Sequence, residues 1–331
     1  MLDPATGTGT FLVEWIRQAR RSHSSVSNGE SWPEHFERVV LPSMHGFELM
    51  LAPYAIAHLK LALETHNDGV AADSGTVLLT DTLERPALEG RFALMDDPVA
   101  AEGERANEVK DHSPITVCVG NPPYDRVAKD AGGGWVTKPW GGRQSLFDDI
   151  LDPARQHTIF SHHASLYNLY VYFWRWSLWK VFEQRSGRPG VVSFITASSW
   201  LTGPGFLGLR QLVRELADEV WVVDLGGDNK GARTEENVFD IETPVAIVTI
   251  YSSGKADRTV PAEVHYRRIS GTRAEKLASL DAFETDPTDW ADAPNGWHAS
   301  FIPTAGGSEW ESYPALTDLF PWQQPGCKFN R

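Results

Sequence analysis

Residues 115–124, with the sequence ITVCVGNPPY, join a segment typical of a buried strand to a rigid polar turn. The first five side chains are β-branched or small and apolar, as in a strand inside a sheet. The turn itself, Asn121-Pro122-Pro123-Tyr124, contains two prolines that fix its backbone, and a glycine-rich loop follows it up to residue 142. The stretch therefore predicts a strand that ends in a pre-shaped functional turn.

Around this strand, the chain alternates between strand-like and helix-like segments. Helical periodicity is present at 11–21, 52–66, 164–184 and 205–217, and Ile56, Leu59 and Leu63 share one apolar stripe of the second helix. The strand-like segments are 1–5, 43–49, 76–83, 115–120, 190–197, 219–226 and 243–252. This alternation predicts an α/β fold with a doubly wound, mostly parallel sheet covered on both faces. No helix separates the last two strands, so we expect them to pair in antiparallel fashion.

Composition narrows the class of protein. A chain of 331 residues that is 41% hydrophobic can bury a large core. Its net charge of −14 argues against a general nucleic-acid-binding surface, because phosphate contacts need clustered Lys and Arg. Cys118 and Cys327 lie far apart and offer no metal-binding spacing, so we expect free thiols in a reducing cytoplasm and no metal site.

Three longer segments bear on domain organisation. The apolar run 166–182 is interrupted by Asn168, Arg175 and Lys180, which predicts a buried or amphipathic helix rather than a membrane span. The polar segments 95–114 and 226–237 are the best candidates for linkers. Beyond about residue 255 the pattern becomes irregular, which indicates the start of a second unit.

The first turn of the chain, DPATGTGTF at 3–11, has the features of a ligand-binding turn. Gly7 and Gly9 allow the backbone to approach a ligand closely, with a helix N-terminus directly behind them. The turn lacks the third glycine of the G-x-G-x-x-G fingerprint, which disfavours a nicotinamide or flavin cofactor. Asp3 places an acid at the strand end, where it could meet a cationic amino group.

Two further acids end the next two predicted strands. Glu48 stands where an acidic residue can bind the hydroxyls of a ribose, and Asp81 ends the third strand. Each alone could equally be a solvated strand-end carboxylate. Because the carboxyl ends of parallel strands line the ligand crevice of open α/β sheets, the three acids together favour a nucleoside cofactor.

The glycine turn and the NPPY motif together resemble the adenine-N6 DNA methyltransferases. DPATGTGTF is similar to their S-adenosylmethionine motif and NPPY to their catalytic motif, in the order of the gamma group. The likeness extends through HGFELMLAPYAIAHLKLAL, LYNLYVYFWRWSLWKVFE and ENVFDIETPVAI, and resembles the methyltransferase region of type ISP restriction-modification enzymes and related phage-defence methylases. It implies a class I S-adenosylmethionine-dependent methyltransferase fold with a seven-stranded-type sheet.

The resemblance also implies a role for each site residue. Asp3, Gly7 and Gly9 would bind the methionine part of S-adenosylmethionine, Glu48 its ribose and Asp81 its adenine. Ala5 would also belong to the cofactor-binding site. Phe239 would be a second aromatic against a flipped-out base; it could also be a core phenylalanine. The loop after the motif contains four basic residues that would contact DNA phosphates: Arg126, Lys129, Lys138 and Arg143. The alternative is that this loop is simply solvated.

The chemistry of the NPPY motif agrees with this resemblance. The adenine amine is a poor nucleophile because its lone pair is delocalised into the ring. Two acceptors, the Asn121 side-chain oxygen and the Pro122 carbonyl, would favour the pyramidal nitrogen that forms during attack. Pro122 and Pro123 pre-aim these acceptors, and Tyr124 would stack on the base after it leaves the duplex. Neither a metal nor a covalent intermediate is required.

Against the family pattern, we expect this chain to be a central fragment. It begins two residues before Asp3, which implies a truncated first strand in a methyltransferase domain at 1–252. Residues 253–331 would be a small irregular C-terminal extension leading to a missing target-recognition domain. The expected partner is double-stranded DNA, bound through a base-flipping cleft together with that domain. No Walker A sequence is present, so helicase or nuclease parts of the same system would lie elsewhere.

Three other functions remain open from the sequence. Protein glutamine methyltransferases also use NPPY on this fold, although the helix at 164–184 and the tail fit the DNA enzymes better. The truncated first strand would also suit a catalytically inactive part of a defence enzyme. A dehydrogenase is disfavoured by the glycine pattern.

Overall fold

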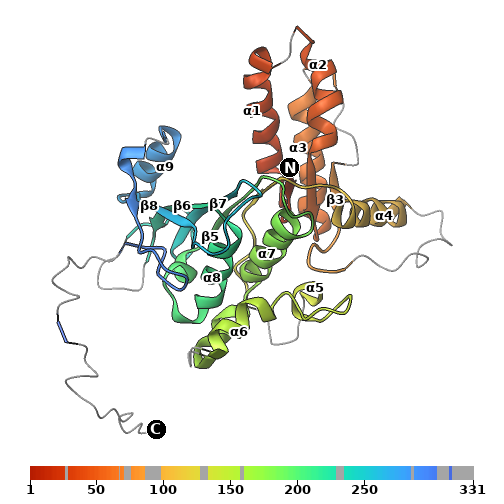
Figure 1. Ribbon diagram of the computed structural model, residues 1–331. Coiled ribbons are helices and arrows are strands. Elements are labelled where there is room, and N and C mark those ends of the chain that lie inside the picture. The colour runs from red at the N-terminus through yellow and green to blue at the C-terminus, as the bar shows by residue number, and fades with distance from the viewer. Residues whose placement is uncertain are drawn as a thin grey trace, which may run out of the picture.

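In the described part of the chain, the predicted alternation produces a nine-stranded sheet, in the order β3-β2-β1-β4-β5-β7-β6-β8-β9 (Figure 1). The computed structural model describes residues 1–26, 29–66, 68–70, 76–85, 98–126, 133–156, 160–228, 235–284, 287–303 and 313–314. The strands are β1 (Leu2–Asp3), β2 (His45–Glu48), β3 (Val77–Leu79), β4 (Val117–Gly120), β5 (Gly190–Ala197), β6 (Glu219–Gly226), β7 (Val245–Ser252), β8 (Glu263–Arg268) and β9 (Ala291–Asp292).

The directions of the strands confirm the expected mostly parallel sheet. The neighbours from β3 to β5 are parallel, whereas β7 is antiparallel to both β5 and β6. The predicted antiparallel pair of β6 and β7 is thus confirmed. Since β7 runs opposite to both of its neighbours, β6 runs in the same direction as β5. The carboxyl ends of β1 to β6 therefore meet at one edge of the sheet, which we call the active edge.

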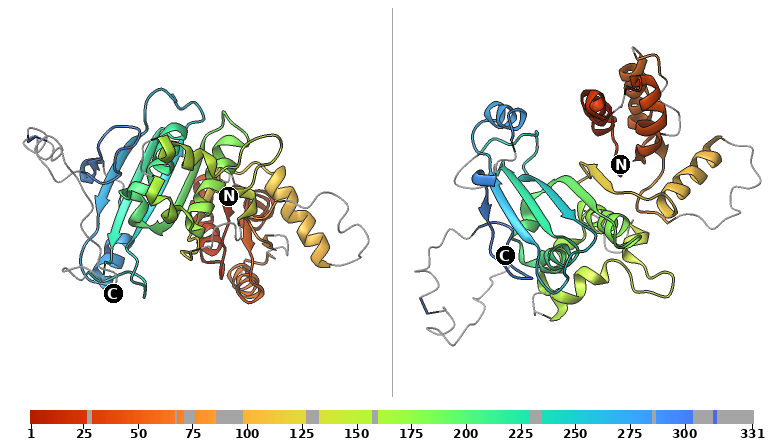
Figure 2. Two further views of the ribbon diagram at one scale, coloured as in Figure 1. Left: turned by 90° about the horizontal axis from the view of Figure 1, so that it is seen from below. Right: turned by 45° about the horizontal axis from the view of Figure 1, so that its top comes forward.

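Helices cover both faces of the sheet, as the connections between parallel strands require (Figure 2). On one face, α1 and α3 pack with the β4 side chains Val117 and Val119; on the other, α7 and α8 pack with Cys118. The helices are α1 (Thr10–Val26), α2 (Trp32–His35), α3 (Leu51–His66), α4 (Pro98–Asp111), α5 (Gly134–Thr137), α6 (Asp148–Gln156), α7 (Leu169–Leu178), α8 (Leu207–Leu216) and α9 (Arg273–Asp281).

Helix α7 explains the charged residues inside the apolar run. It continues into a π-helical turn, Trp179–Glu183, and is buried on almost all sides. Arg175 is fully buried and pairs with Asp149 at 2.6 Å and Glu183 at 3.0 Å, so its charge is compensated. Within the described part of the chain, no helix is long and apolar enough to cross a membrane.

The stripe expected on α3 faces solvent, which corrects the role that its periodicity suggests. Ile56, Leu59 and Leu63 are 43%, 60% and 64% exposed, whereas Ala57 and Leu61 are buried. The helix is apolar around much of its circumference, and its Ala57 face packs on the glycine turn. The two backbones approach so closely that only small residues fit at positions 9 and 57, because a Cβ on Gly9 would lie 3.2 Å from the Ala57 Cα.

Two segments are more regular than their sequences predict. Residues 98–111, inside the expected linker 95–114, form α4. Beyond residue 255, β8 pairs in parallel with β6, and α9 follows with a Thr272–Glu275 capping box. The sheet thus extends past its expected seven strands. The division at residues 252 and 253 into a domain and an extension stays a prediction.

Candidate active site

The acids and the tetrapeptide converge at the active edge, as their positions in the sequence predict. Asp3 and Glu48 are the last residues of β1 and β2, Asp81 follows β3 by two residues, and Asn121 directly follows β4. These four strands are adjacent in the sheet. The described residues near them contain no cluster of three side chains that could hold a metal ion.

Glu48 holds the glycine turn in place. Its carboxylate accepts hydrogen bonds from the backbone N–H groups of Gly7, at 2.7 Å, and Met50, at 2.8 Å. Gly7 has φ +55, and a Cβ built on it would meet no atom within 4 Å. The turn therefore leaves open space at Gly7, where a ligand can approach the backbone, while Gly9 is required for the close packing of α3.

Asp3 is a fully buried carboxyl group whose Oδ2 has no hydrogen-bond partner among the described residues. Its Oδ1 accepts from the N–H of Ala5 at 3.1 Å. Burial raises the pKa of Asp3 to about 7, opposed by the hydrogen bond from Ala5 and assisted by the charge of Glu48. A buried acceptor without a partner is costly, so this site is suited to a cationic or hydrogen-bond-donating ligand group.

Asp81 lies in a turn that the buried side chain of Lys110 holds in place. The Asp81 carboxylate accepts from the N–H of Leu83 at 2.8 Å. Lys110, only 2% exposed, donates from Nζ to the Asp81 carbonyl at 2.7 Å, the Thr80 hydroxyl at 2.8 Å and the Glu84 carbonyl at 3.2 Å. Sequence reasoning missed Lys110, because it lies in a segment whose polarity suggested a linker.

The NPPY turn presents the Asn121 and Tyr124 side chains at the active edge. Asn121 is exposed, Pro122 is buried and Tyr124 is half-buried. The Tyr124 hydroxyl donates to Asn121 Oδ1 at 2.8 Å, which orients the amide oxygen. Burial raises the pKa of Tyr124, so the phenol stays protonated and remains a donor.

Helix α7 anchors the turn from its C-terminal side. The N–H of Leu169 donates to the Asp125 carbonyl at 2.9 Å, and the Tyr170 ring meets the Tyr124 ring edge to face at 6.2 Å. Arg126 is exposed and forms an isolated bridge with Asn168. Of the other basic residues expected to contact phosphates, Lys138 and Arg143 are exposed, and Lys129 lies outside the described residues.

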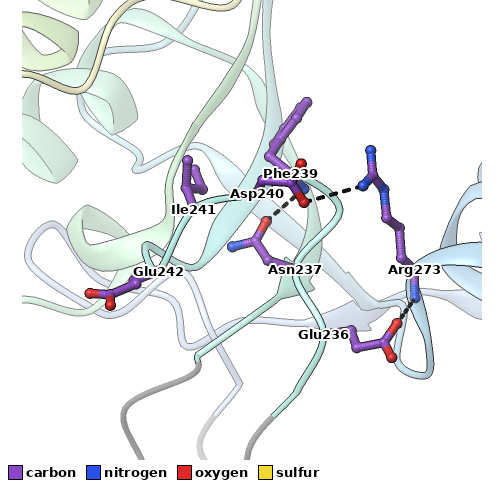
Figure 3. A pocket seen from close by; sticks show the side chains of 7 residues that line it. All are labelled: Glu236, Asn237, Phe239, Asp240, Ile241, Glu242 and Arg273. Atoms are coloured by element: carbon purple, nitrogen blue, oxygen red, sulfur yellow. Dashed lines mark hydrogen bonds and ion pairs between the residues drawn. The ribbon is translucent and has the colours of Figure 1, made fainter.

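Phe239 reaches the same edge from the loop between β6 and β7. It is half-buried, and it packs against the same hydrophobic cluster as Tyr124, formed by Val223, Leu225, Val238, Val245 and Ile269. A pocket of about 400 Å³ lies beside it, lined by residues of the 236–242 segment and by Arg273 (Figure 3). The structure thus packs two aromatic rings, those of Tyr124 and Phe239, against one hydrophobic cluster.

The geometry suits a nucleoside cofactor with a cationic end. Asp3 offers a buried acceptor, Gly7 leaves open space, Glu48 offers acceptors for hydroxyl groups, and Asp81 projects from the next strand end. These are the groups that S-adenosylmethionine would need for its amino group, ribose and adenine. The assignments of the individual residues remain predictions.

Solved structures share this fold, whereas no protein-family model and no curated protein matches the sequence. A nuclease-deletion mutant of the type ISP restriction-modification enzyme LlaGI, in complex with a DNA substrate mimic, matches with a TM-score of 0.73 and 23% identity over 95% of this chain. The ATP-dependent type ISP enzyme LlaBIII bound to DNA matches with 0.70 and 23% over 90%. A DrdV–DNA complex matches with 0.63 and 24%, also over 90%.

These matches confirm the expected fold. At identities of 23% and 24% they show a shared fold. The chain spans only 25%, 20% and 27% of the LlaGI, LlaBIII and DrdV chains, respectively. The likeness to type ISP restriction-modification enzymes that the motifs suggested is thus confirmed in the fold.

Proposed function

We propose that this chain transfers a methyl group from S-adenosylmethionine to N6 of an adenine flipped out of double-stranded DNA. It would be the methyltransferase part of a restriction-modification or related phage-defence enzyme. One observation carries the proposal: the NPPY turn follows β4 directly, beside the strand ends that bear Asp3, Glu48 and Asp81. An amide acceptor and an aromatic ring are thereby next to a site suited to a nucleoside cofactor.

In this proposal the residues of the chain orient and polarise the substrate. S-adenosylmethionine would supply the electrophilic methyl group. The target amine would donate to Asn121 Oδ1, which Tyr124 already orients, and to the Pro122 carbonyl. Both acceptors become stronger partners as positive charge develops on the amine, so they favour the transition state over the ground state. Tyr124 and Phe239 would stack on the base.

DNA binding by this chain would be local. The net charge of −14 supplies no general phosphate-binding surface. Arg126 and the basic loop that follows NPPY would contact phosphates near the flipped base. Sequence recognition, and any helicase or nuclease activity, would belong to other parts of a longer enzyme, since this chain spans only 20% to 27% of the similar structures.

The test is methyl transfer by Asn121→Ala. We expect kcat to fall about 100- to 1,000-fold, the range seen when a transition-state hydrogen-bond partner is removed. Because the proposal assigns Asn121 to the target amine and not to the cofactor, the affinity for S-adenosylmethionine should stay within about twofold. Labelled S-adenosylmethionine and a duplex with an unpaired adenine would measure transfer, since an unpaired base removes most of the flipping cost. Calorimetry would measure cofactor binding.

Tyr124→Phe is a graded control. It keeps the ring but removes the hydroxyl that orients Asn121, so we expect only about a tenfold loss of kcat. Wild-type methylation by Asn121→Ala would contradict the assigned role. Label that appears on a protein glutamine rather than on DNA would favour a glutamine methyltransferase.

A further inference from the structure

The loop that carries Phe239 is closed by one buried side chain. Asn237 is 7% exposed, and its Nδ2 donates to the Thr243 carbonyl at 2.8 Å and the Gly227 carbonyl at 3.3 Å. Its Oδ1 accepts from the N–H of Phe239 at 2.9 Å (Figure 3). One amide thus joins the start, the tip and the end of the loop.

Helix α9 holds the same loop from outside. Lys276 is fully buried, and its Nζ donates to the Leu225 carbonyl at 2.6 Å and the Glu236 carbonyl at 2.7 Å. It also pairs with Glu235 at 2.8 Å. The backbone N–H of Arg273 donates to the Glu236 carboxylate at 2.7 Å. The two residues that precede Asn237 are therefore fixed by α9 through both backbone and side-chain contacts.

Strand β8 contributes a second set of ion pairs. Arg268 contacts Asp224 at 2.6 Å and Glu235 at 2.5 Å, and the Tyr266 hydroxyl donates to Asp224 at 2.7 Å. Asp224 is only 3% exposed. Burial would raise the pKa of Glu235, but hydrogen bonding from Lys276 and the charge of Arg268 lower it overall. The Glu235 carboxylate is thus held ionised, and both carboxylates are held in fixed positions.

The backbone leaves little room for another loop conformation. Gly227 has φ +96, and a Cβ on it would lie 2.6 Å from Asn237 Nδ2. The loop therefore passes directly over the end of β6, at a distance that only glycine allows. A buried polar network with its partners in place favours one conformation over alternatives.

We propose that β8 and α9 form a brace that positions Phe239 against the flipped base, with Lys276 and Asn237 as its positioning residues. The inference rests on the proposed function, which gives Phe239 its role. It adds that the strand and helix beyond the first seven strands belong to the base-binding site. Neither residue touches the base; each acts through the conformation of the 235–244 loop.

Lys276→Met and Lys180→Met form a matched pair of variants. Lys180 is also a buried lysine that donates to three backbone carbonyls, those of Val109, Lys110 and Ser113, but these belong to the end of α4 and the segment after it. Hydrogen exchange of the Phe239 N–H reports directly on the bond to Asn237. We expect this exchange to become at least about tenfold faster in Lys276→Met and to stay unchanged in Lys180→Met, after correction for global stability.

Methyl transfer supplies the second readout. At saturating S-adenosylmethionine, kcat on an unpaired adenine should fall about tenfold in Lys276→Met, because a misplaced ring loses stacking on the base. Cofactor affinity should stay within about twofold of the wild type, since the brace lies at the β6 end of the active edge.

Asn237→Asp covers the possibility that Lys276→Met does not fold. It keeps the shape of the side chain but replaces the Nδ2 donor by an oxygen that faces two carbonyls, so it should accelerate exchange at Phe239 in the same way. Unchanged exchange in either folded variant would overturn the brace. A wild-type chain that transfers no methyl group to adenine would instead contradict the proposed function, so the two failures are distinguishable.

Discussion

The active edge has two parts whose buried polar groups differ in their hydrogen bonding: the part around β3, β2 and β1, which we call the β1 end, and the part around β6, which we call the β6 end. At the β1 end, Asp3 is buried with one oxygen lacking a partner among the described residues, and Gly7 borders open space. At the β6 end, Asp224 is also a buried aspartate, two residues before the last residue of its strand, but Tyr266 and Arg268 donate hydrogen bonds to it. One end leaves an acceptor available, and the other uses its acceptors internally.

This difference distinguishes a part of the site that can bind a ligand from a part that stabilises one conformation of the protein. A buried acceptor without a partner costs about 1 to 3 kcal/mol, which a ligand that donates to it can recover. A paired network recovers that cost within the protein and stabilises one conformation. We therefore infer that the β1 end is built to receive a cofactor and that the β6 end is built to hold the aromatic side of the base-binding site.

The strongest test of this comparison exchanges the two aspartates for asparagine. Asp3→Asn should weaken S-adenosylmethionine binding about 30- to 100-fold, the loss of a charge-assisted hydrogen bond of about 2 to 3 kcal/mol. Asp224→Asn should leave cofactor affinity within about twofold but lower the free energy of unfolding by about 2 kcal/mol, because Arg268 and Tyr266 lose a charged partner. Calorimetry and urea denaturation would measure the two effects.

The two variants control for each other. If Asp224→Asn weakened cofactor binding as much as Asp3→Asn, the division of the active edge would be wrong. If Asp3→Asn left binding unchanged in a folded protein, Asp3 would not contact the cofactor.

A smaller effect is expected from the aromatic side. Phe239→Ala should lower kcat/KM for methyl transfer about 10- to 30-fold, because stacking on a base contributes about 1 to 3 kcal/mol. Phe239→Tyr should retain most of the activity, since it keeps the ring. Labelled methyl transfer to an unpaired adenine is the measurement. Equal rates for Phe239→Ala and the wild type would show that Phe239 does not stack on the base.

The pKa of Asp3 gives a prediction with a definite sign. Its value of about 7 lies above the ordinary 3.8, so the carboxyl group is protonated in the free protein below pH 7. A cationic ligand group prefers the ionised form, and binding below pH 7 must release a proton. Cofactor affinity should therefore rise about tenfold between about pH 5.5 and 7. Calorimetry in buffers of different ionisation enthalpy would detect the released proton.

Stability of the free protein should change in the opposite direction. A carboxyl group with a raised folded-state pKa favours folding below its unfolded pKa of 3.8, and this contribution is lost as the pH rises towards 7. Asp3→Asn should remove both dependences. A cofactor affinity that falls from pH 5.5 to 7 in the wild type would contradict a cationic partner for Asp3.

The same contrast explains what the sequence can predict. The site residues of the β1 end can be recognised from their immediate neighbours in the sequence, because each acid or short motif lies at or just after the end of a predicted strand. Parallel strands then bring these carboxyl ends together. The brace has no such signal. Lys276 meets Leu225 across 51 residues and Arg268 meets Asp224 across 44, so in the sequence these residues are indistinguishable from solvated charges.

Periodicity fails on α3 for a different reason. The helix carries apolar side chains on more than one face, so the 3.6-residue repeat identifies a helix but does not select its buried side. The close approach of Ala57 to the glycine turn selects that side, and this contact depends on how two turns of the chain pack together. The small side chain of Ala57 allows this close approach, which the apolar periodicity does not report.

Lys110 is a fully paired side chain at the β1 end, and it provides the finest test of the comparison. Its ammonium group fixes the turn that presents Asp81, and its three hydrogen bonds leave no N–H free to bind a ligand. Its replacement should therefore affect the conformation of the turn and not remove a contact with the cofactor. We expect Lys110→Met to weaken S-adenosylmethionine binding only about three- to fivefold, because the turn can still form without it. An analogue without the adenine base should bind both proteins equally, since the Asp81 turn would contact only the base. A loss of cofactor affinity as large as that of Asp3→Asn, or one that the base-free analogue shares, would place Lys110 in direct contact with the cofactor. The distinction between acceptors that await a ligand and groups that hold the fold would then be wrong.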